Sequence, residues 1–106
     1  MNILKIVNGK VEVRKDNGTL IRTVSLSGGD TAVYADFNVN QSLIAVTTAK
    51  GKVEIRKENG TLIRTINLNS GSIAINARWN GSDLAITTNK GKTEIRKENG
   101  TLIRTI

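Results

Sequence analysis

Short segments in which apolar and polar residues alternate make up most of this chain, and turns that contain glycine separate them. Alternation with a period of two residues is typical of half-buried strands, and the segments are rich in Val, Ile and Thr, which favour strands. Apolar residues spaced for one face of a helix are missing. The pattern therefore predicts an all-β chain. In its middle part we expect four short strands at roughly Thr31–Phe37, Leu43–Thr48, Lys52–Lys57 and Thr61–Leu68.

The same dipeptide precedes each strand of the Leu-Ile-Arg-Thr type: Asn17-Gly18, Asn59-Gly60 and Asn99-Gly100. Asn-Gly between alternating segments predicts a two-residue hairpin loop of type I′, because that turn needs positive φ at both central positions. Such a loop places Arg56 opposite Ile63. One face of the hairpin then carries Val53, Ile55, Leu62 and Ile66.

A block of sixteen residues occurs three times, with first residues Gly9, Gly51 and Gly91. The spacings are 42 and 40 residues, and the last two copies differ only where Val53 is replaced by Thr93. Between the blocks the match is looser, and TAVYADFN at residues 31–38 aligns with IAINARWN at residues 73–80. The chain is therefore an internal repeat of about two and a half units.

A period of about 40 residues with four strands is the signature of a β-propeller blade. The stretch Ile75–Ile106 resembles a blade of the WD40-like propellers, in which an inner strand ends in an aromatic residue, here Trp79, before a Gly- and Asp-containing turn. Basic pairs stand where that family has its Trp-Asp dipeptide: Arg56-Lys57 and Arg96-Lys97. The resemblance implies a β-propeller of four-stranded antiparallel blades. The near identity of the repeats indicates recent amplification, or a designed or reconstructed propeller fragment.

We expect one repeat domain over residues 1–106, with a partial blade at 1–26 and full blades at 31–68 and 72–106. With Asn2–Val7 as its first strand, the partial blade lacks an innermost strand. Propellers close with four to eight blades, so an open arc would expose an apolar blade face at each end. We therefore expect the ring to be completed by homo-oligomerisation, as a dimer with six blades or, alternatively, a trimer. The predicted contacts between blades are Val53, Ile55, Leu62, Ile66, Ile75, Ala85 and Ile86.

The composition excludes several kinds of chemistry, because the chain contains no His and no Cys. Zinc sites of the Cys/His kind, cysteine nucleophiles and Ser-His triads all need these residues. We expect no catalytic, cofactor or metal site, and the main prediction is a non-catalytic scaffold. Three glutamates lie two residues before an arginine, and we interpret these as ordinary charge pairs that form a repeated structural ladder and not a catalytic pair: Glu12 with Arg14, Glu54 with Arg56, and Glu94 with Arg96. For Asp36 we expect only a turn-making or solubilising role.

Basic residues exceed acidic ones by 16 to 9, which gives a net charge of +7. One alternative function is polyanion binding, to nucleic acid or phosphate, through a repeated belt of Arg14, Lys15, Arg56, Lys57, Arg96 and Lys97. A second is multivalent glycan binding in pockets between blades, although one Trp in the chain is little for such sites.

The N-terminus has no signal peptide and the chain has no Cys, which favours a cytoplasmic location. The apolar runs are too short to span a bilayer, so we expect no membrane partner.

Overall fold

The computed structural model describes residues 1–69 and 71–106, and this part of the chain forms eleven strands. Their bounds are β1 (Asn2–Val7), β2 (Lys10–Lys15), β3 (Leu20–Val24), β4 (Ala32–Phe37), β5 (Leu43–Thr48), β6 (Val53–Lys57), β7 (Leu62–Ile66), β8 (Ala74–Asn80), β9 (Asp83–Thr88), β10 (Thr93–Lys97) and β11 (Leu102–Thr105). No helix in the described residues is long and apolar enough to cross a membrane.

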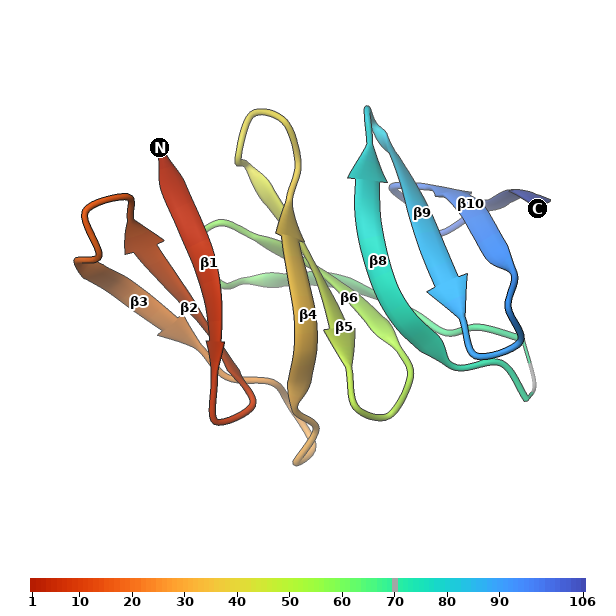
Figure 1. Cartoon of the computed structure of the whole chain (residues 1–106), viewed down its shortest axis with the longest axis horizontal. Coiled ribbons are helices and arrows are strands. Elements are labelled where there is room, and N and C mark those ends of the chain that lie inside the picture. The colour runs from red at the N-terminus through yellow and green to blue at the C-terminus, as the bar shows by residue number, and fades with distance from the viewer. Residues whose placement is uncertain (70) are drawn as a thin grey trace.

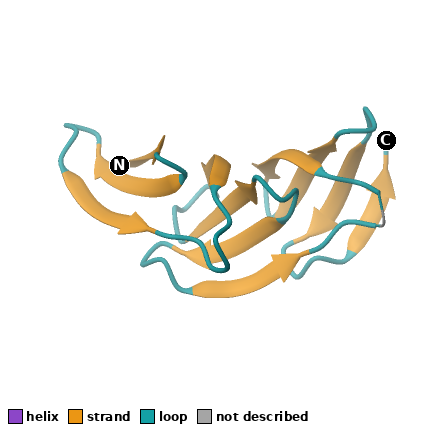
Figure 2. Ribbon diagram, turned by 90° about the horizontal axis from the view of Figure 1, so that it is seen from below, coloured by secondary structure: helices purple, strands orange, loops and turns teal. Residues whose placement is uncertain are grey.

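The strands form three separate antiparallel sheets that follow one another along the chain (Figure 1). The first sheet has the order β1-β2-β3, the second β4-β5-β6-β7 and the third β8-β9-β10-β11. Seen from below, the sheets are arranged along an arc, with the two termini at its opposite ends (Figure 2). The predicted all-β class with four-stranded antiparallel sheets is therefore confirmed.

Each pair of neighbouring sheets encloses its own apolar core. We call the two contacts the first and second junctions. The first junction is formed by Val11, Val13 and Val24 of the first sheet with Ala32, Ile44 and Val46 of the second. The second junction is formed by Ala45, Val53, Ile55 and Ile66 of the second sheet with Ala74, Ala77, Leu84 and Ile86 of the third. The middle sheet is thus covered on both faces, whereas each outer sheet is covered on one.

The Asn-Gly hairpins do not have the predicted geometry. The Gly60 N–H donates to the Lys57 carbonyl at 2.9 Å, and the Lys57 N–H donates to the Thr61 carbonyl at 2.8 Å. Gly60 has a φ of +95°, but Asn59 is not among the residues with positive φ. The prediction of a type I′ turn is therefore wrong. The bonds are those of a three-residue loop, in which a type I turn is followed by a left-handed glycine.

This loop changes the register of the outer strand. Arg56 pairs with Leu62 instead of Ile63, and an irregularity between Ile55 and Arg56 restores the predicted pairing further on. As a result the Leu62 side chain is 40% exposed, which contradicts the prediction that it packs between blades. The prediction for Ile75 is also wrong, because its side chain is 51% exposed on β8. Ala85 is half-buried, and the remaining predicted contact residues are buried.

The two-residue loop with positive φ at both positions lies elsewhere, between β1 and β2. Asn8 has a φ of +52° and Gly9 a φ of +75°, and Val7 pairs with Lys10 across the loop. In the second sheet the corresponding turn is one residue longer. Its bonds run from the Gly51 N–H to the Thr48 carbonyl and from the Thr48 N–H to the Lys52 carbonyl. The Asn8-Gly9 dipeptide in the sequence could have predicted this loop.

Candidate functional site

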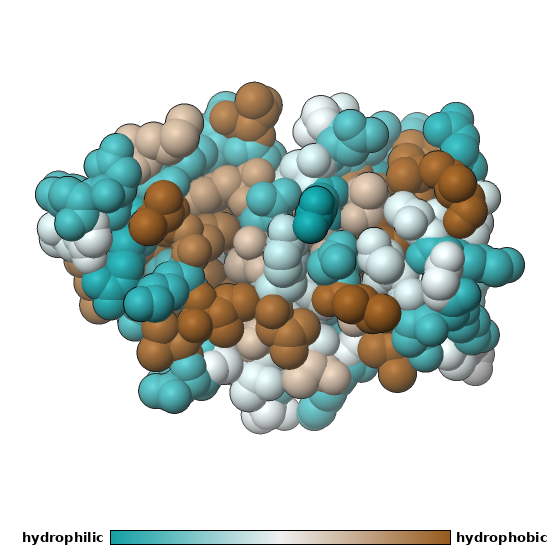
Figure 3. Space-filling model, viewed as in Figure 1, coloured by the Kyte–Doolittle hydropathy of each residue, from teal (hydrophilic) through white to brown (hydrophobic). Residues whose placement is uncertain are grey.

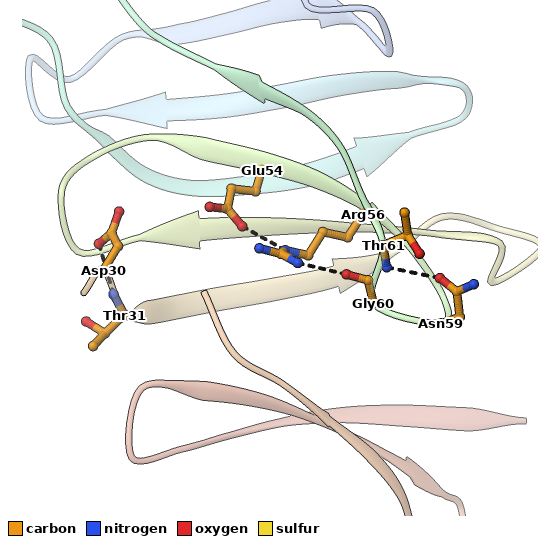
Figure 4. A network of polar contacts seen from close by, with 7 residues as sticks. All are labelled: Asp30, Thr31, Glu54, Arg56, Asn59, Gly60 and Thr61. Atoms are coloured by element: carbon orange, nitrogen blue, oxygen red, sulfur yellow. Dashed lines mark hydrogen bonds and ion pairs between the residues drawn. The ribbon is translucent and has the colours of Figure 1, made fainter. Parts of the chain in front are cut away.

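The glutamate and arginine pairs are confirmed as contacts, and those of the second and third sheets are buried. Arg56 Nε lies 2.7 Å from Glu54 Oε1, and both residues are only 6% exposed (Figure 4). Arg56 Nη1 also donates to the Gly60 carbonyl at 2.7 Å, which ties the pair to the hairpin loop. The burial follows from register, because Glu54 pairs with Val46 on the face that the first sheet covers. Sequence spacing placed both charges on one face but did not show which residues of the neighbouring sheet cover it.

The same arrangement occurs once in every sheet, with a difference in burial. In the third sheet Glu94 and Arg96 are 2.8 Å apart and buried, because they face the second junction. In the first sheet Glu12 and Arg14 are also 2.8 Å apart, but their side chains are 14% and 28% exposed. This pair faces outward, where no sheet of the described residues covers it. A buried charge pair is therefore a feature of both junctions, and its third copy lies on an open face.

The arrangement divides the six residues of the predicted basic belt into two groups. Each arginine is folded back onto a glutamate, and for Arg56 and Arg96 the charge is paired inside a junction. The lysines of the belt are all exposed to solvent: Lys15, Lys57 and Lys97. The structure places these lysines at equivalent positions, each as the last residue of the strand before an Asn-Gly loop, namely β2, β6 and β10.

A second set of ion pairs connects one sheet to the next. Arg22 on β3 lies 3.2 Å from Glu58 in the loop of the second sheet, and Arg64 on β7 lies 3.2 Å from Glu98 in the loop of the third. These side chains are 35–39% exposed, so each pair is worth less than about 1 kcal/mol. The pairs recur at the same positions of both junctions, which shows that the two pairs of neighbouring sheets are aligned in the same way.

The next arginine in this series is Arg104 on β11. It is exposed, and it makes no ion pair within the described part of the chain. In the first sheet the position of Glu58 and Glu98 is taken by Asp16, which is 73% exposed and lies 3.8 Å from the amino terminus of Met1. The two outer faces therefore carry complementary halves of the ion pair.

Backbone contacts at the junctions depend on glycine. The Gly9 carbonyl accepts a hydrogen bond from the Ala32 N–H at 2.8 Å, and the Gly51 carbonyl accepts one from the Ala74 N–H at 3.0 Å. A Cβ at Gly51 would overlap the Ile73 side chain. These glycines let the inner strand of the next sheet approach the preceding turn.

The inner strands of the second and third sheets are joined by Trp79. Its indole Nε1 donates to the Asp36 carbonyl at 3.1 Å, and its backbone N–H donates to Asp36 Oδ2 at 2.9 Å. The prediction that Asp36 only makes turns or aids solubility is therefore wrong, because it lies within β4 and holds β8. Nothing in the local sequence predicts the contact, since the two residues are 43 positions apart.

The outer faces are more polar than the faces inside the junctions. On the third sheet Thr93 takes the place that Val53 has in the second junction. On the first sheet Lys5 pairs with Glu12 as Val46 pairs with Glu54, so Lys5 stands at a position that is fully buried in the second sheet. Apolar residues remain on both faces, since Ile3 is 46% and Ile106 is 75% exposed.

A shallow groove lies at the outer side of each junction, with volumes of about 410 and 380 Å³. The first is lined by Arg22, Thr23, Val24, Ser25, Arg56, Asn59, Gly60 and Thr61, and the second by the equivalent residues of the next sheets. The linings are polar and contain no aromatic residue. Within residues 1–69 and 71–106 no group of three His, Cys, Asp or Glu could hold a metal ion.

Asp30, the carboxylate of the loop between β3 and β4, accepts hydrogen bonds from several donors. Partial burial would raise the pKa of Asp30, but hydrogen bonds from the Thr48 side chain and from the backbone of Thr31 and Lys50 outweigh it, and the Lys50 charge adds to them. The net effect lowers the pKa of Asp30 below its usual value. The Thr31 N–H donates to Asp30 Oδ1 at 2.9 Å (Figure 4), so Asp30 fixes the start of β4 as a charged group.

Comparison with known proteins gives one family and a common architecture. The family model described as Helicobacter pylori IceA2 protein matches residues 1–66. No curated protein matches the chain significantly.

Among solved structures, the mitotic checkpoint complex contains a chain with a TM-score of 0.83 and 17% identity, over 99% of this chain and 33% of that one. BamB from Moraxella catarrhalis has a TM-score of 0.76 and 17% identity, over 98% and 32% of the two chains. Saccharomyces cerevisiae Sqt1 has a TM-score of 0.74 and 14% identity, over 98% and 30%. These are propeller-type proteins, so the likeness shows a propeller-type fold, and the chain spans about a third of their length.

Proposed function

Since the chain belongs to the Helicobacter pylori IceA2 protein family and has a propeller-type fold, we propose that it is a non-catalytic repeat scaffold that self-assembles head to tail into a closed ring. The observation that carries the proposal is the repetition of one junction. Successive sheets dock twice within the chain through the same contacts, and the unmatched halves of a third junction remain on the two outer faces. The partner proposed for each outer face is a second copy of this chain.

Charge complementarity supports this pairing. The internal junctions each contain an arginine of the outer strand beside an acidic residue of the next hairpin loop. Docking the third sheet on the first sheet of another copy would bring Arg104 to Asp16 in the same relation. The shorter aspartate keeps the charge of Glu58 and Glu98 at that position.

Packing supports the same register. Within the chain, Gly60 lies next to Val24 and Gly100 lies next to Ile66, so a loop glycine meets the apolar end of the preceding outer strand at both junctions. Ile106 is the corresponding apolar residue of the third sheet, and Gly18 is the corresponding loop glycine of the first. In the proposed contact, Gly18 of a second copy would cover Ile106, which is otherwise 75% exposed. The contact would also bury the Glu12 and Arg14 pair as the equivalent pairs are buried.

A contact between two different surfaces either closes into a ring or continues as a filament. The arc of the three sheets makes closure the expected outcome, and two chains would give six blades. A trimer is the alternative. The first blade of each chain would have three strands instead of four.

The test is native mass spectrometry and light scattering of the 106-residue chain and of charge variants. Arg104→Glu places two acidic groups together at each contact between chains. We therefore expect the oligomer of this variant to dissociate at a protein concentration at least about tenfold higher than the native oligomer does. Combining Arg104→Glu with Asp16→Arg restores opposite charges and should restore the oligomer.

A matched control is Lys97→Glu, which makes the same change of charge at an exposed position, and its equivalent beside the second junction, Lys57, is exposed as well. It should leave the oligomer unchanged. A native chain that stays monomeric at all accessible concentrations would overturn the proposal. An oligomer that is indifferent to Arg104→Glu would overturn the proposed contact.

A further inference from the structure

The first sheet lacks the inner strand that the other two sheets have. β1 pairs with β2 on one side, whereas β5 and β9, which hold the same place in their sheets, pair on the other side with β4 and β8. The register fixes the equivalence, because Asn2 pairs with Lys15 as Leu43 pairs with Lys57. The edge of β1 is therefore the edge that an innermost strand occupies elsewhere in the molecule.

The side chain of Gln41 shows that this edge is ready to form strand hydrogen bonds. Its Oε1 accepts from the Asn2 N–H at 3.1 Å, and its Nε2 donates to the Asn2 carbonyl at 2.8 Å. In the second sheet Asn38 does the same for Leu43, since its N–H donates to the Leu43 carbonyl and its Oδ1 accepts from the Leu43 N–H. Gln41 thus takes the place of one residue of an inner strand, and it holds a φ of +59° to do so.

Beyond Asn2, two further residues present backbone groups to the same side. Because N–H and C=O directions alternate along a strand, Leu4 and Ile6 face the open edge as Asn2 does. Their equivalents in the second sheet, Ala45 and Thr47, pair with Asp36 and Tyr34 of β4. In the described structure β1 has no strand on this side. An unpaired edge of this kind is a template for an added strand.

An apolar surface lies beside the edge. β4 packs against β1 across the first junction, and Phe37, Leu4 and Ile6 pack against the core of this junction while only half-buried. Figure 3 shows apolar side chains gathered on this side of the molecule, over β1 and toward β4. In the complete pair of sheets, β4 takes the corresponding place and is held there by Trp79 of β8. An added strand would therefore meet hydrogen-bonding groups on β1 and an apolar wall on β4.

We propose that the open edge of β1 binds an extended segment of another polypeptide by strand addition, and that this segment has the sequence pattern of β8. The pattern follows from the occupants of the equivalent places, β4 and β8, which share a small residue, Ala35 or Ala77, two positions before an aromatic residue. The segment runs antiparallel to β1. This site goes beyond the proposed ring, because it uses neither outer face.

The register of the added strand can be given from β8. Ala85 pairs with Arg78 and Thr87 pairs with Asn76 in the third sheet. A segment of this type would therefore place its Arg78 and Asn76 positions opposite Leu4 and Ile6. Its last residue would compete with the Gln41 side chain for Asn2, because Asn80 pairs at that level of the sheet. Gln41→Ala should accordingly tighten binding several-fold.

The test uses the full chain with a synthetic peptide of residues 72–80, followed by calorimetry and by hydrogen exchange of backbone amides. We expect saturable binding, with slower exchange at the amides of Leu4 and Ile6. The control peptide carries Asn76→Pro, which removes the donor opposite Ile6, and it should bind at least about tenfold more weakly. Exchange protection confined to the outer strands β3, β7 and β11, or equal binding of the proline peptide, would overturn the proposal.

The same measurement is repeated on the Arg104→Glu variant. Since the β1 edge does not depend on the outer faces, peptide binding should be unchanged at protein concentrations at which this variant is monomeric. Loss of binding in this variant alone would overturn the assignment to β1. Absence of binding in an oligomeric native chain would overturn the strand-addition site and leave the proposed ring untouched.

Discussion

At the scale of single residues, losing one partner of the buried pair of Glu54 and Arg56 should cost more stability than losing one partner of an ordinary charge pair on a strand. Both side chains lie inside the first junction, and the guanidinium is shared between the carboxylate and the Gly60 carbonyl. Removing one partner of a buried pair leaves the other charged and desolvated. The identical pair of Glu12 and Arg14 on the open face has water in reach of both groups.

We predict that Glu54→Ala lowers the free energy of unfolding by about 3 kcal/mol or more, because it leaves the Arg56 charge unpaired inside the junction. Glu12→Ala makes the same change on the open face and should cost about 1 kcal/mol or less in the monomeric state. Urea unfolding of both variants, in the Arg104→Glu background and at a protein concentration at which that variant is monomeric, gives the comparison. Equal losses in the two variants would contradict the role assigned to burial.

At the scale of elements, the strands could be predicted from the sequence because their signal is local. Alternation and turn residues placed β4, β5, β6 and β7 within about two residues of their bounds. The hairpin geometry could not, because Asn-Gly fits both a two-residue loop and the last two positions of a three-residue loop. The Asn59 side chain stabilises the longer loop, since its Oδ1 accepts a hydrogen bond from the Thr61 N–H at 3.0 Å. Because the predicted loop was one residue too short, Leu62 was predicted on the wrong face of the sheet.

The loop glycines allow the cost of the turn to be separated from the cost of the junction. Gly18 and Gly60 have φ values of +94° and +95°, so an added Cβ is strained equally in both. At Gly18 the Cβ would meet open space, whereas at Gly60 it would lie 3.3 Å from Val24. We predict that Gly18→Ala costs about 1–2 kcal/mol, the penalty of the left-handed conformation, and that Gly60→Ala costs more.

Thermal unfolding of the two glycine variants checks this prediction, in the Arg104→Glu background and at a concentration at which the chain is monomeric, because Gly18 would meet Ile106 of a second copy in the proposed ring. The difference between their melting temperatures reports the contact with Val24, because the turn term is common to both. A Gly60→Ala variant as stable as Gly18→Ala would mean that Val24 moves enough to accommodate the added methyl group without loss of stability. A Gly18→Ala variant as stable as the native chain would contradict the left-handed turn itself.

At the scale of the whole molecule, the sequence repeat predicted the order of the sheets but not the contacts between them. The contacts of Arg22 with Glu58 and of Trp79 with Asp36 join residues that are far apart in the chain. The repeat shows that such contacts recur, yet their partners emerge only when the sheets are placed side by side. The same holds for Gln41, whose pairing with Asn2 depends on the first sheet having three strands.

The two polar replacements on the outer faces set the strength of the proposed ring. Thr93 and Lys5 stand where the internal junctions have Val53 and Val46, and burying an unpaired hydroxyl costs about 1–3 kcal/mol. The contact between copies should therefore be weaker than the contacts within the chain. We predict that Thr93→Val lowers the dissociation constant of the oligomer by about tenfold, which corresponds to 1.4 kcal/mol.

Analytical ultracentrifugation over a dilution series measures this change. The matched control is Val53→Thr, which introduces the same hydroxyl into the second junction and should lower the stability of the chain instead of its tendency to assemble. If Thr93→Val leaves assembly unchanged while Val53→Thr destabilises the fold, then the outer face of the third sheet does not meet another copy in the register of the internal junctions. If Thr93→Val strengthens assembly, the internal junction is the correct template for the contact between chains.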